Sequence, residues 1–118
     1  MVERLKQAYL LWHEYHSTLP KIHRYTLGGT IDALFVSTLE ATAGAAFLPR
    51  EEKSPYVRLA VRKLDTLKIL LMILWETKSL DTKKYAALSI KVDEAGKMLG
   101  GWSGQLAKQN SPPKGEEK

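Results

Sequence analysis

The sequence contains no cysteine, which excludes a disulfide framework, a thiolate nucleophile and a cysteine-ligated metal or iron–sulfur site. Long hydrophobic runs are also missing. The longest one, from Ile69 to Trp75, is far shorter than the roughly 20 residues that span a bilayer. The first residues lack the apolar region of a signal peptide. We therefore expect a cytoplasmic protein without membrane contact, and the 118 residues suit one domain.

Acidic residues are fewer than basic ones. The chain has 18 Lys and Arg against 13 Asp and Glu, which gives a net charge of +5. This balance suits a polyanionic partner such as nucleic acid, and equally an acidic protein or an anionic surface. Charge alone does not choose between these partners.

Apolar residues recur at helical spacing in four segments, whereas no strand-like alternation exceeds a few residues. The first predicted helix runs from Val2 to about residue 18 and stops before Pro20. A short link follows over residues 20–25. Thr26 is then the predicted cap of a second helix over 27–47, whose first turn is weakened by two glycines, Gly28 and Gly29.

The third predicted helix covers 54–78, with Ser54 as N-cap and Pro55 at the first helical position, after a polar connection over 48–53. Its second half, Ile69 to Trp75, is apolar in every direction. A surface helix of a monomer normally keeps a polar side. This half is therefore either the centre of a bundle or covered on its outer face by another subunit.

The last predicted helix follows a turn over 77–81 that Ser79 or Asp81 can cap. It carries an a/d-type seam of apolar residues over about three heptads. The seam residues are Tyr85, Leu88, Val92, Ala95, Leu99, Trp102 and Leu106.

Four helices joined by short links predict an all-α fold, an antiparallel up-and-down four-helix bundle over residues 1–108. The remaining residues, 109–118, are polar, include two prolines and show no apolar spacing. We expect them to form a disordered tail.

Familiar catalytic and metal-binding patterns are incomplete. His13 and His16 are three residues apart and share a helical face, with Glu14 between them in sequence, but the zincin pattern places its histidines four residues apart and needs a third ligand. The segment from Gly101 to Gln105 lacks the second glycine of a nucleophile elbow. We predict no catalytic residue, cofactor or metal site, and a non-enzymatic protein; an enzyme using the two histidines and a carboxylate is the weakest alternative.

Three glycines, Gly96, Gly100 and Gly104, are spaced four residues apart and so form one ridge of the last helix. Glycine disfavours a soluble helix by roughly 1 kcal/mol relative to alanine. The ridge therefore favours close approach of another backbone, either a partner helix or a neighbouring subunit.

Basic residues form two groups in the sequence. An ordinary solvated face is the alternative to phosphate binding for both. The first group lies on the later helices, where few acids offset its charge, and the second lies in the first link. The first group is Arg58, Arg62, Lys63, Lys84 and Lys91, and the second is Lys21, His23 and Arg24.

Two segments carry a family resemblance. The stretch Leu-Pro-Lys-Ile-His-Arg-Tyr-Thr-Leu-Gly over 19–28, followed by Ile31, and the stretch Val-Asp-Glu-Ala-Gly-Lys-Met-Leu-Gly-Gly-Trp over 92–102 resemble the accessory variability determinant (Avd) proteins of diversity-generating retroelements. The likeness covers about residues 5–106. These proteins belong to a four-helix-bundle group that includes the 23S rRNA intervening-sequence proteins.

The resemblance implies a homopentamer of four-helix bundles that forms a basic barrel with a central pore. It also implies association with a reverse transcriptase and with RNA or DNA during mutagenic homing, with the protein itself not the polymerase. The basic groups would then face nucleic acid or transcriptase. The residues expected at the interface between subunits are Ile69, Met72, Ile73 and Trp75 and the glycines Gly96, Gly100 and Gly104. The alternative is a structural protein–protein interaction bundle of the intervening-sequence type.

Overall fold

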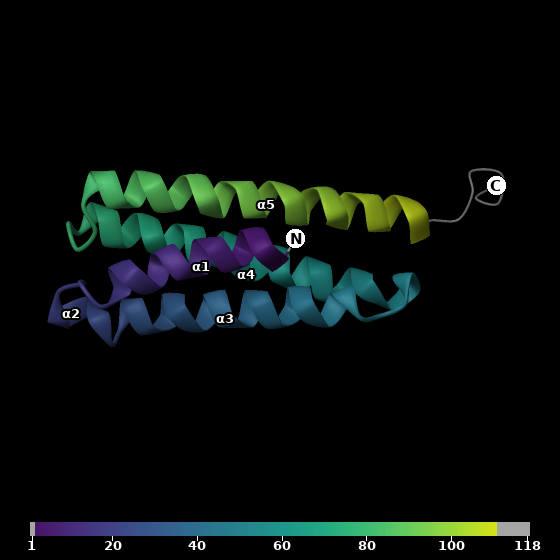
Figure 1. Cartoon of the computed structure of the whole chain (residues 1–118), viewed down its shortest axis with the longest axis horizontal. Coiled ribbons are helices and arrows are strands. Elements are labelled where there is room, and N and C mark those ends of the chain that lie inside the picture. The colour runs from purple at the N-terminus through teal and green to yellow at the C-terminus, as the bar shows by residue number, and fades with distance from the viewer. Residues whose placement is uncertain (1, 111–118) are drawn as a thin grey trace.

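The computed structural model describes residues 2–110, and these residues form helices and turns without any β-strand. Figure 1 shows the helices in chain order. They are α1 (Val2–His16), α2 (Lys21–Arg24), α3 (Leu27–Ala46), α4 (Arg50–Glu76) and α5 (Thr82–Asn110).

The four long helices form a bundle in which consecutive members run antiparallel (Figure 1). α1 packs against α3 and α5, and α4 packs against the same two helices from the other side. The helices therefore make a closed ring in the order α1, α3, α4, α5. This confirms the predicted all-α four-helix fold. The link over 20–25 was predicted without structure and instead contains the short helix α2.

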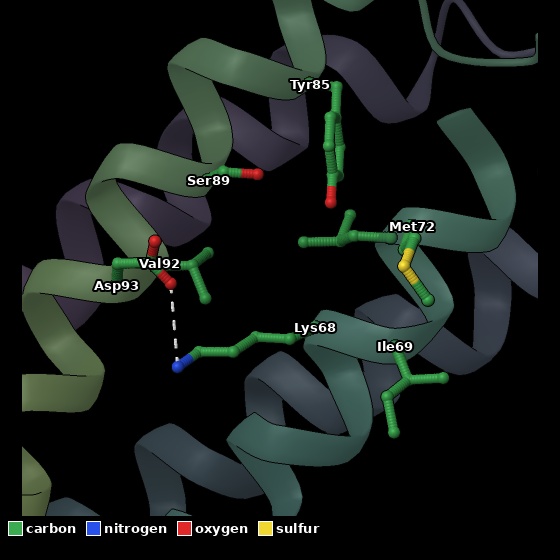
Figure 2. Close-up of a pocket in the computed structure, with 8 residues that line it drawn as sticks. Lys68, Ile69, Met72, Tyr85, Ser89, Val92 and Asp93 are labelled. Carbon is green, nitrogen blue, oxygen red and sulfur yellow. Dashed lines mark ion pairs between the residues drawn. The ribbon is translucent and has the colours of Figure 1, made fainter. Parts of the chain in front are cut away.

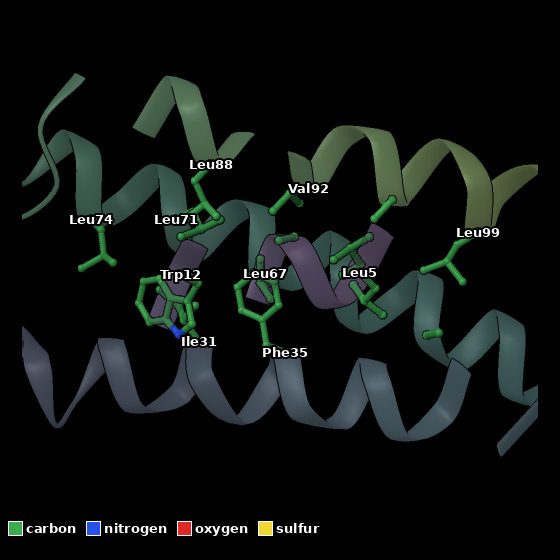
Figure 3. Close-up of a cluster of buried hydrophobic side chains, with 14 of the residues drawn as sticks. Leu5, Trp12, Ile31, Phe35, Leu67, Leu71, Leu74, Leu88, Val92 and Leu99 are labelled. Atoms are coloured by element: carbon green, nitrogen blue, oxygen red, sulfur yellow. The ribbon is translucent and has the colours of Figure 1, made fainter. Parts of the chain in front are cut away.

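The main core lies where all four long helices meet (Figure 3). Trp12 of α1 and Phe35 of α3 are fully buried, and their rings stack with centroids 6.1 Å apart. The predicted seam of α5 is confirmed, because its central residues are buried and its two aromatic members are half-buried and pack on the core. Aromatic and leucine side chains thus fill this part of the bundle.

α1 is too short to line the whole bundle. Its 15 residues extend about 22 Å, whereas the 29 residues of α5 extend about 43 Å. The bundle therefore has a four-helix half, which holds α1, α2 and the turn over 77–81. It also has a three-helix half, made by the end of α3, the start of α4 and the end of α5 (Figure 1). A second, small core occupies the three-helix half, with Ala45, Val57 and Leu106 buried and Trp102 packed on them.

α4 begins at Arg50, four residues before the predicted start, so Ser54 and Pro55 lie inside the helix and are neither N-cap nor first helical residue. Acidic residues in the first turn, Glu51 and Glu52, favour this earlier start because they face the positive end of the helix dipole. Pro55 removes one intrahelical hydrogen bond at an exposed position, where water can satisfy the free carbonyl.

Lys53, in the first turns of α4, ties the start of this helix to the end of α3. Its ammonium donates to the carbonyl oxygens of Ala45 and Ala46, at 2.8 and 3.3 Å. These are the last carbonyls of α3, which have no partner within that helix. The residues predicted as a polar connection thus include a helix turn that caps the preceding helix.

The first turn of α3 is helical although it holds two glycines. Thr26 occupies the predicted cap position, but its hydroxyl donates to the carbonyl of Ile22 at 2.8 Å and accepts no hydrogen bond from the N–H groups of the first turn, so its side chain does not cap the helix. Gly28 is buried, and a Cβ there would lie 2.8 Å from the His23 carbonyl oxygen. Glycine is required at this position by the approach of α2.

In the turn between α4 and α5, Asp81 rather than Ser79 is the residue that caps α5. The Asp81 carboxylate accepts from the backbone N–H of Lys84 at 2.8 Å, whereas Ser79 is engaged elsewhere. Lys78 has a φ of 66°, and the following two N–H groups donate to the carbonyl of Leu74. At the other end, α5 continues to Asn110, so the first two residues of the predicted tail are helical. The rest of that tail, 111–118, lies outside the described residues.

Candidate functional site

Arg58 and Arg62 are exposed on α4, one helical turn apart. Together with Pro55, Val61 and Ser103 they line a surface depression of about 410 Å³. Neither guanidinium forms an ion pair among residues 2–110. Guanidinium groups bind phosphate oxygens through paired N–H donors. This pair is therefore chemically suited to a phosphate group.

The other basic residues predicted with this pair lie elsewhere. Lys63 lines a different depression, which it shares with Glu40 of α3. Lys84 lies in the four-helix half, where its ammonium is 3.4 Å from the Thr18 hydroxyl and 5.5 Å from the centre of the Tyr15 ring. Lys91 is exposed on α5. The predicted first group is thus dispersed over the bundle.

Two members of the second basic group hold the fold together. The His23 ring hydrogen-bonds to the Ser79 hydroxyl, 56 residues away. The Arg24 guanidinium donates twice to the carbonyl of Leu19, at 3.2 and 3.0 Å. Only Lys21 of this group is exposed and makes no such contact. The partner of His23 is far away in the sequence, and the partner of Arg24 is a backbone carbonyl. No sequence pattern predicts either hydrogen bond.

The apolar second half of α4 is only partly covered. Leu71 and Leu74 are buried, but Ile69 is 56% exposed and Met72 and Ile73 are each 38% exposed. Of the two sequence alternatives, burial at the centre of the bundle is therefore excluded for the outer residues. No segment of the described chain covers them.

A depression of about 370 Å³ lies beside these residues, between α4 and α5 (Figure 2). Met72, Tyr85 and Ser89 line it, and an ion pair between Lys68 and Asp93, with N and O 3.6 Å apart, crosses from one helix to the other. The depression is open and partly apolar, so it can accept an apolar side chain from a partner.

Trp75 has a different role from the other predicted interface residues. Its ring stacks on Tyr85 with centroids 4.9 Å apart, and its indole N–H donates to the Thr82 hydroxyl at 3.0 Å. These contacts fix the turn between α4 and α5. Trp75 is still 37% exposed, so its outer edge adjoins the uncovered apolar surface.

The glycine ridge is only partly used within the chain. A Cβ on Gly96 would lie 2.9 Å from the Lys68 ammonium nitrogen and 3.5 Å from a methyl group of Leu64, both on α4. A Cβ on Gly100 or Gly104 would have nothing within 4 Å. The close helix packing predicted for the ridge is therefore absent inside the described chain at these two glycines.

The histidines near the end of α1 do not gather metal ligands. His16 stacks on Trp12 with centroids 5.0 Å apart and donates to the carbonyl of Arg24 at 2.8 Å. The Trp12 indole donates to Asp32 at 3.2 Å. Burial and the Asp32 carboxylate raise the pKa of the Tyr9 phenol. Residues 2–110 contain no group of three or more histidine, aspartate or glutamate side chains placed to hold a metal ion.

Sequence reasoning overlooked three exposed apolar side chains, Ile22, Tyr25 and Phe47, which stand at the two ends of the bundle.

Within the described range, no helix has the length and apolar character needed to cross a membrane. Comparison of the chain with family models, curated proteins and solved structures found no match. The function is therefore argued from the chemistry of these surfaces.

Proposed function

We propose that this protein is a non-enzymatic accessory protein that self-associates and scaffolds a reverse transcriptase together with its RNA or DNA, as the Avd resemblance implies. One observation carries the proposal. Arg58, Arg62, Ile69 and Ile73 are all exposed, and their spacing of four, seven and four residues places them on one outer stripe of α4. Unpaired cations and uncovered apolar side chains thus share a single face.

The cationic part of this stripe supports nucleic-acid binding. The two guanidiniums border the depression that also holds Ser103, and the carboxylates of the described chain leave them unpaired. Phosphate contacts made by such groups release counterions, so affinity should fall steeply with added salt.

The apolar part supports association with another protein surface. Ile69 lines the open depression between α4 and α5, about two helical turns from Arg62, and Ile73 is exposed one turn further along α4. A second copy of the chain would remove these side chains from water, and the open glycines Gly100 and Gly104 would admit a close neighbour. The number of five subunits comes from the resemblance alone.

The nucleic-acid assignment is tested with the double variant Arg58→Ala/Arg62→Ala. We expect weaker binding to RNA and DNA and a log–log salt slope smaller by about two, because two phosphate contacts are lost. The double variant Arg4→Ala/Lys6→Ala is the control. It removes the same charge from cations that are already paired with Glu94 and Glu3. Equal binding by both variants would show that the pair does not contact phosphate.

Self-association is tested by sedimentation equilibrium at high salt, which removes bound nucleic acid. We expect a mass of several chains, near five if the resemblance holds, and a monomer for Ile69→Glu/Ile73→Glu. Leu10→Glu, at a 48% exposed position on α1, is the matched control and should keep the wild-type mass. A monomeric wild-type protein would overturn the self-association part of the proposal.

The second candidate function is a structural bundle whose main partner is another protein. The uncovered Ile69 and Ile73 favour it as much as they favour self-association. Its distinguishing sign is an affinity that barely changes with salt, together with purified protein that carries no nucleic acid.

A further inference from the structure

α2 and the turn over 77–81 form one end of the molecule (Figure 1). The hydrogen bond between His23 and Ser79 joins them. Two large apolar side chains of this end are among the most exposed in the described chain, Ile22 at 74% and Tyr25 at 75%. We call this region, with the exposed Lys21 and Lys78, the basic tip.

α2 has four residues, which is too short for a helix to be stable by itself. Interactions with its neighbours hold it: His16 donates to the carbonyl of Arg24, and the Arg24 guanidinium donates to the carbonyl of Leu19. Gly28 allows α3 to approach the His23 carbonyl closely. The fold therefore holds α2 firmly in place while leaving the side chains of Ile22 and Tyr25 in solvent.

Lys78 has an unusual backbone conformation. Its φ of 66° makes it the only non-glycine residue with a positive φ among residues 2–110. It follows the end of α4 at the position where helices commonly use glycine, which adopts this conformation without steric cost. Unusual backbone conformations of this kind cluster at functional sites, which makes Lys78 a candidate member of a binding site.

The tip is also rich in unpaired positive charge. The three ion pairs of the described chain involve other residues. Only two carboxylates, Glu76 and Asp81, lie in the turn region, and Asp81 caps α5. The cations at this end are Lys21, Arg24, Lys78, Lys83 and Lys84.

We propose that the basic tip binds single-stranded nucleic acid, with a base stacked on the Tyr25 ring, Ile22 packed beside it, and Lys21 and Lys78 on the flanking phosphates. This inference rests on the proposed function and deepens it by naming the class of nucleic acid and a second contact region. Aromatic rings beside cations bind single strands without sequence preference, since every base offers a flat face. The Arg24 guanidinium, 6.0 Å from the centre of the Tyr25 ring, adds to this arrangement.

A duplex would not use the tip in this way, because its bases are stacked on each other and cannot reach the Tyr25 ring. The tip should therefore prefer an unpaired strand over a duplex of the same length. Its chemistry does not depend on the 2′-hydroxyl, so RNA and DNA single strands should both bind.

The test measures fluorescence anisotropy of labelled RNA and DNA strands of about 12 nucleotides, and of the matching duplex, with the full chain. Tyr25→Ala should weaken single-strand binding about tenfold, whereas Tyr25→Phe keeps the ring and should bind nearly as the wild type does. Phe47→Ala removes the 90% exposed aromatic ring of the opposite end and should change nothing.

Lys78→Gly separates binding from folding. Glycine suits the backbone at this position, so the melting temperature should stay the same or rise. Single-strand affinity should nevertheless fall, and the salt slope should decrease by about one, because one phosphate contact is lost.

Three results would contradict the inference, and they are distinguishable. A wild-type chain that binds no nucleic acid overturns the proposed nucleic-acid function and the tip with it. Salt-dependent binding that Arg58→Ala/Arg62→Ala weakens, but that Tyr25→Ala and Lys78→Gly leave unchanged, overturns the tip alone. Loss of binding to phosphatidylserine vesicles in Tyr25→Ala, with nucleic-acid binding intact, would assign the tip to an anionic membrane surface.

Discussion

The two halves of the bundle differ in what fills their interiors. In the four-helix half, Trp12 and Phe35 stack among buried leucines (Figure 3). In the three-helix half the fully buried side chains are small by comparison, Ala45, Val57 and Leu106, and Trp102 is half-buried under the Lys53 ammonium. Buried apolar area sets local stability. The comparison teaches that the half with α1 is the rigid one, and it also carries the basic tip.

The largest effect is expected from Trp12→Ala. The change removes the biggest buried side chain and leaves Asp32 without its indole donor, so it should lower the free energy of unfolding by about 3–5 kcal/mol. Trp102→Ala, in the three-helix half, should cost about half as much because its ring is partly in solvent already. Urea unfolding followed by circular dichroism measures both. Equal losses would mean that the halves do not differ in packing.

A matched pair of leucines sharpens the comparison without aromatic rings. Leu67→Ala in the main core should cost about 3–4 kcal/mol, and Leu106→Ala in the small core about 2 kcal/mol, since fewer neighbours surround the second cavity. Hydrogen exchange should also show faster opening of the last turns of α5 than of its middle. Protection that is uniform along α5 would contradict the division into two halves.

Gly28 and Gly29 provide a test within the four-helix half. Gly28→Ala places a Cβ 2.8 Å from the His23 carbonyl oxygen and 3.0 Å from a methyl group of Leu19, so we expect a loss of about 1–2 kcal/mol. A Cβ on Gly29 meets nothing within 4 Å, so Gly29→Ala should stabilise the helix by about 0.5–1 kcal/mol. Thermal unfolding measures both variants. Stabilisation by both would show that α2 does not press against α3.

The smallest expected effect is a pH dependence of the folding stability, which arises from Tyr9 in the four-helix half. Burial and Asp32 raise the pKa of Tyr9, so the folded state favours the protonated phenol. The resulting stability is present below the ordinary tyrosine pKa of about 10 and is lost as the pH rises through the folded-state pKa. Tyr9→Phe should therefore lessen the decline of the urea midpoint above pH about 10. Tyr25→Phe, at an exposed position, is the control and should leave the decline as it is.

Much of the fold follows from local patterns. The four amphipathic segments, the stop before Pro20 and the seam of α5 are properties of neighbouring residues, and the structure has them. The start of α4 was misplaced because Pro55 after Ser54 matches a helix start, while the earlier start depends on acidic residues and on the contact of Lys53 with the end of α3.

The candidate site was less accessible to sequence reasoning. The uncovered stripe of α4 could be anticipated, because a continuous apolar run leaves some side chains outside any bundle. The roles of His23 and Arg24 could not, since charge and spacing look the same whether a side chain faces solvent or binds a distant carbonyl or hydroxyl. The positive φ of Lys78 likewise leaves no mark in the sequence.

The ring order of the helices has a kinetic consequence. Three of its four contacts, α3 with α4, α4 with α5 and α1 with α3, join segments that follow one another, and only α1 with α5 joins distant ones. Chains dominated by local contacts fold in microseconds to milliseconds. Docking of α1 on α5, near the ion pair of Arg4 with Glu94, closes the longest loop of the ring and so carries the largest loop-closure entropy; we expect it to be the last of the four contacts to form.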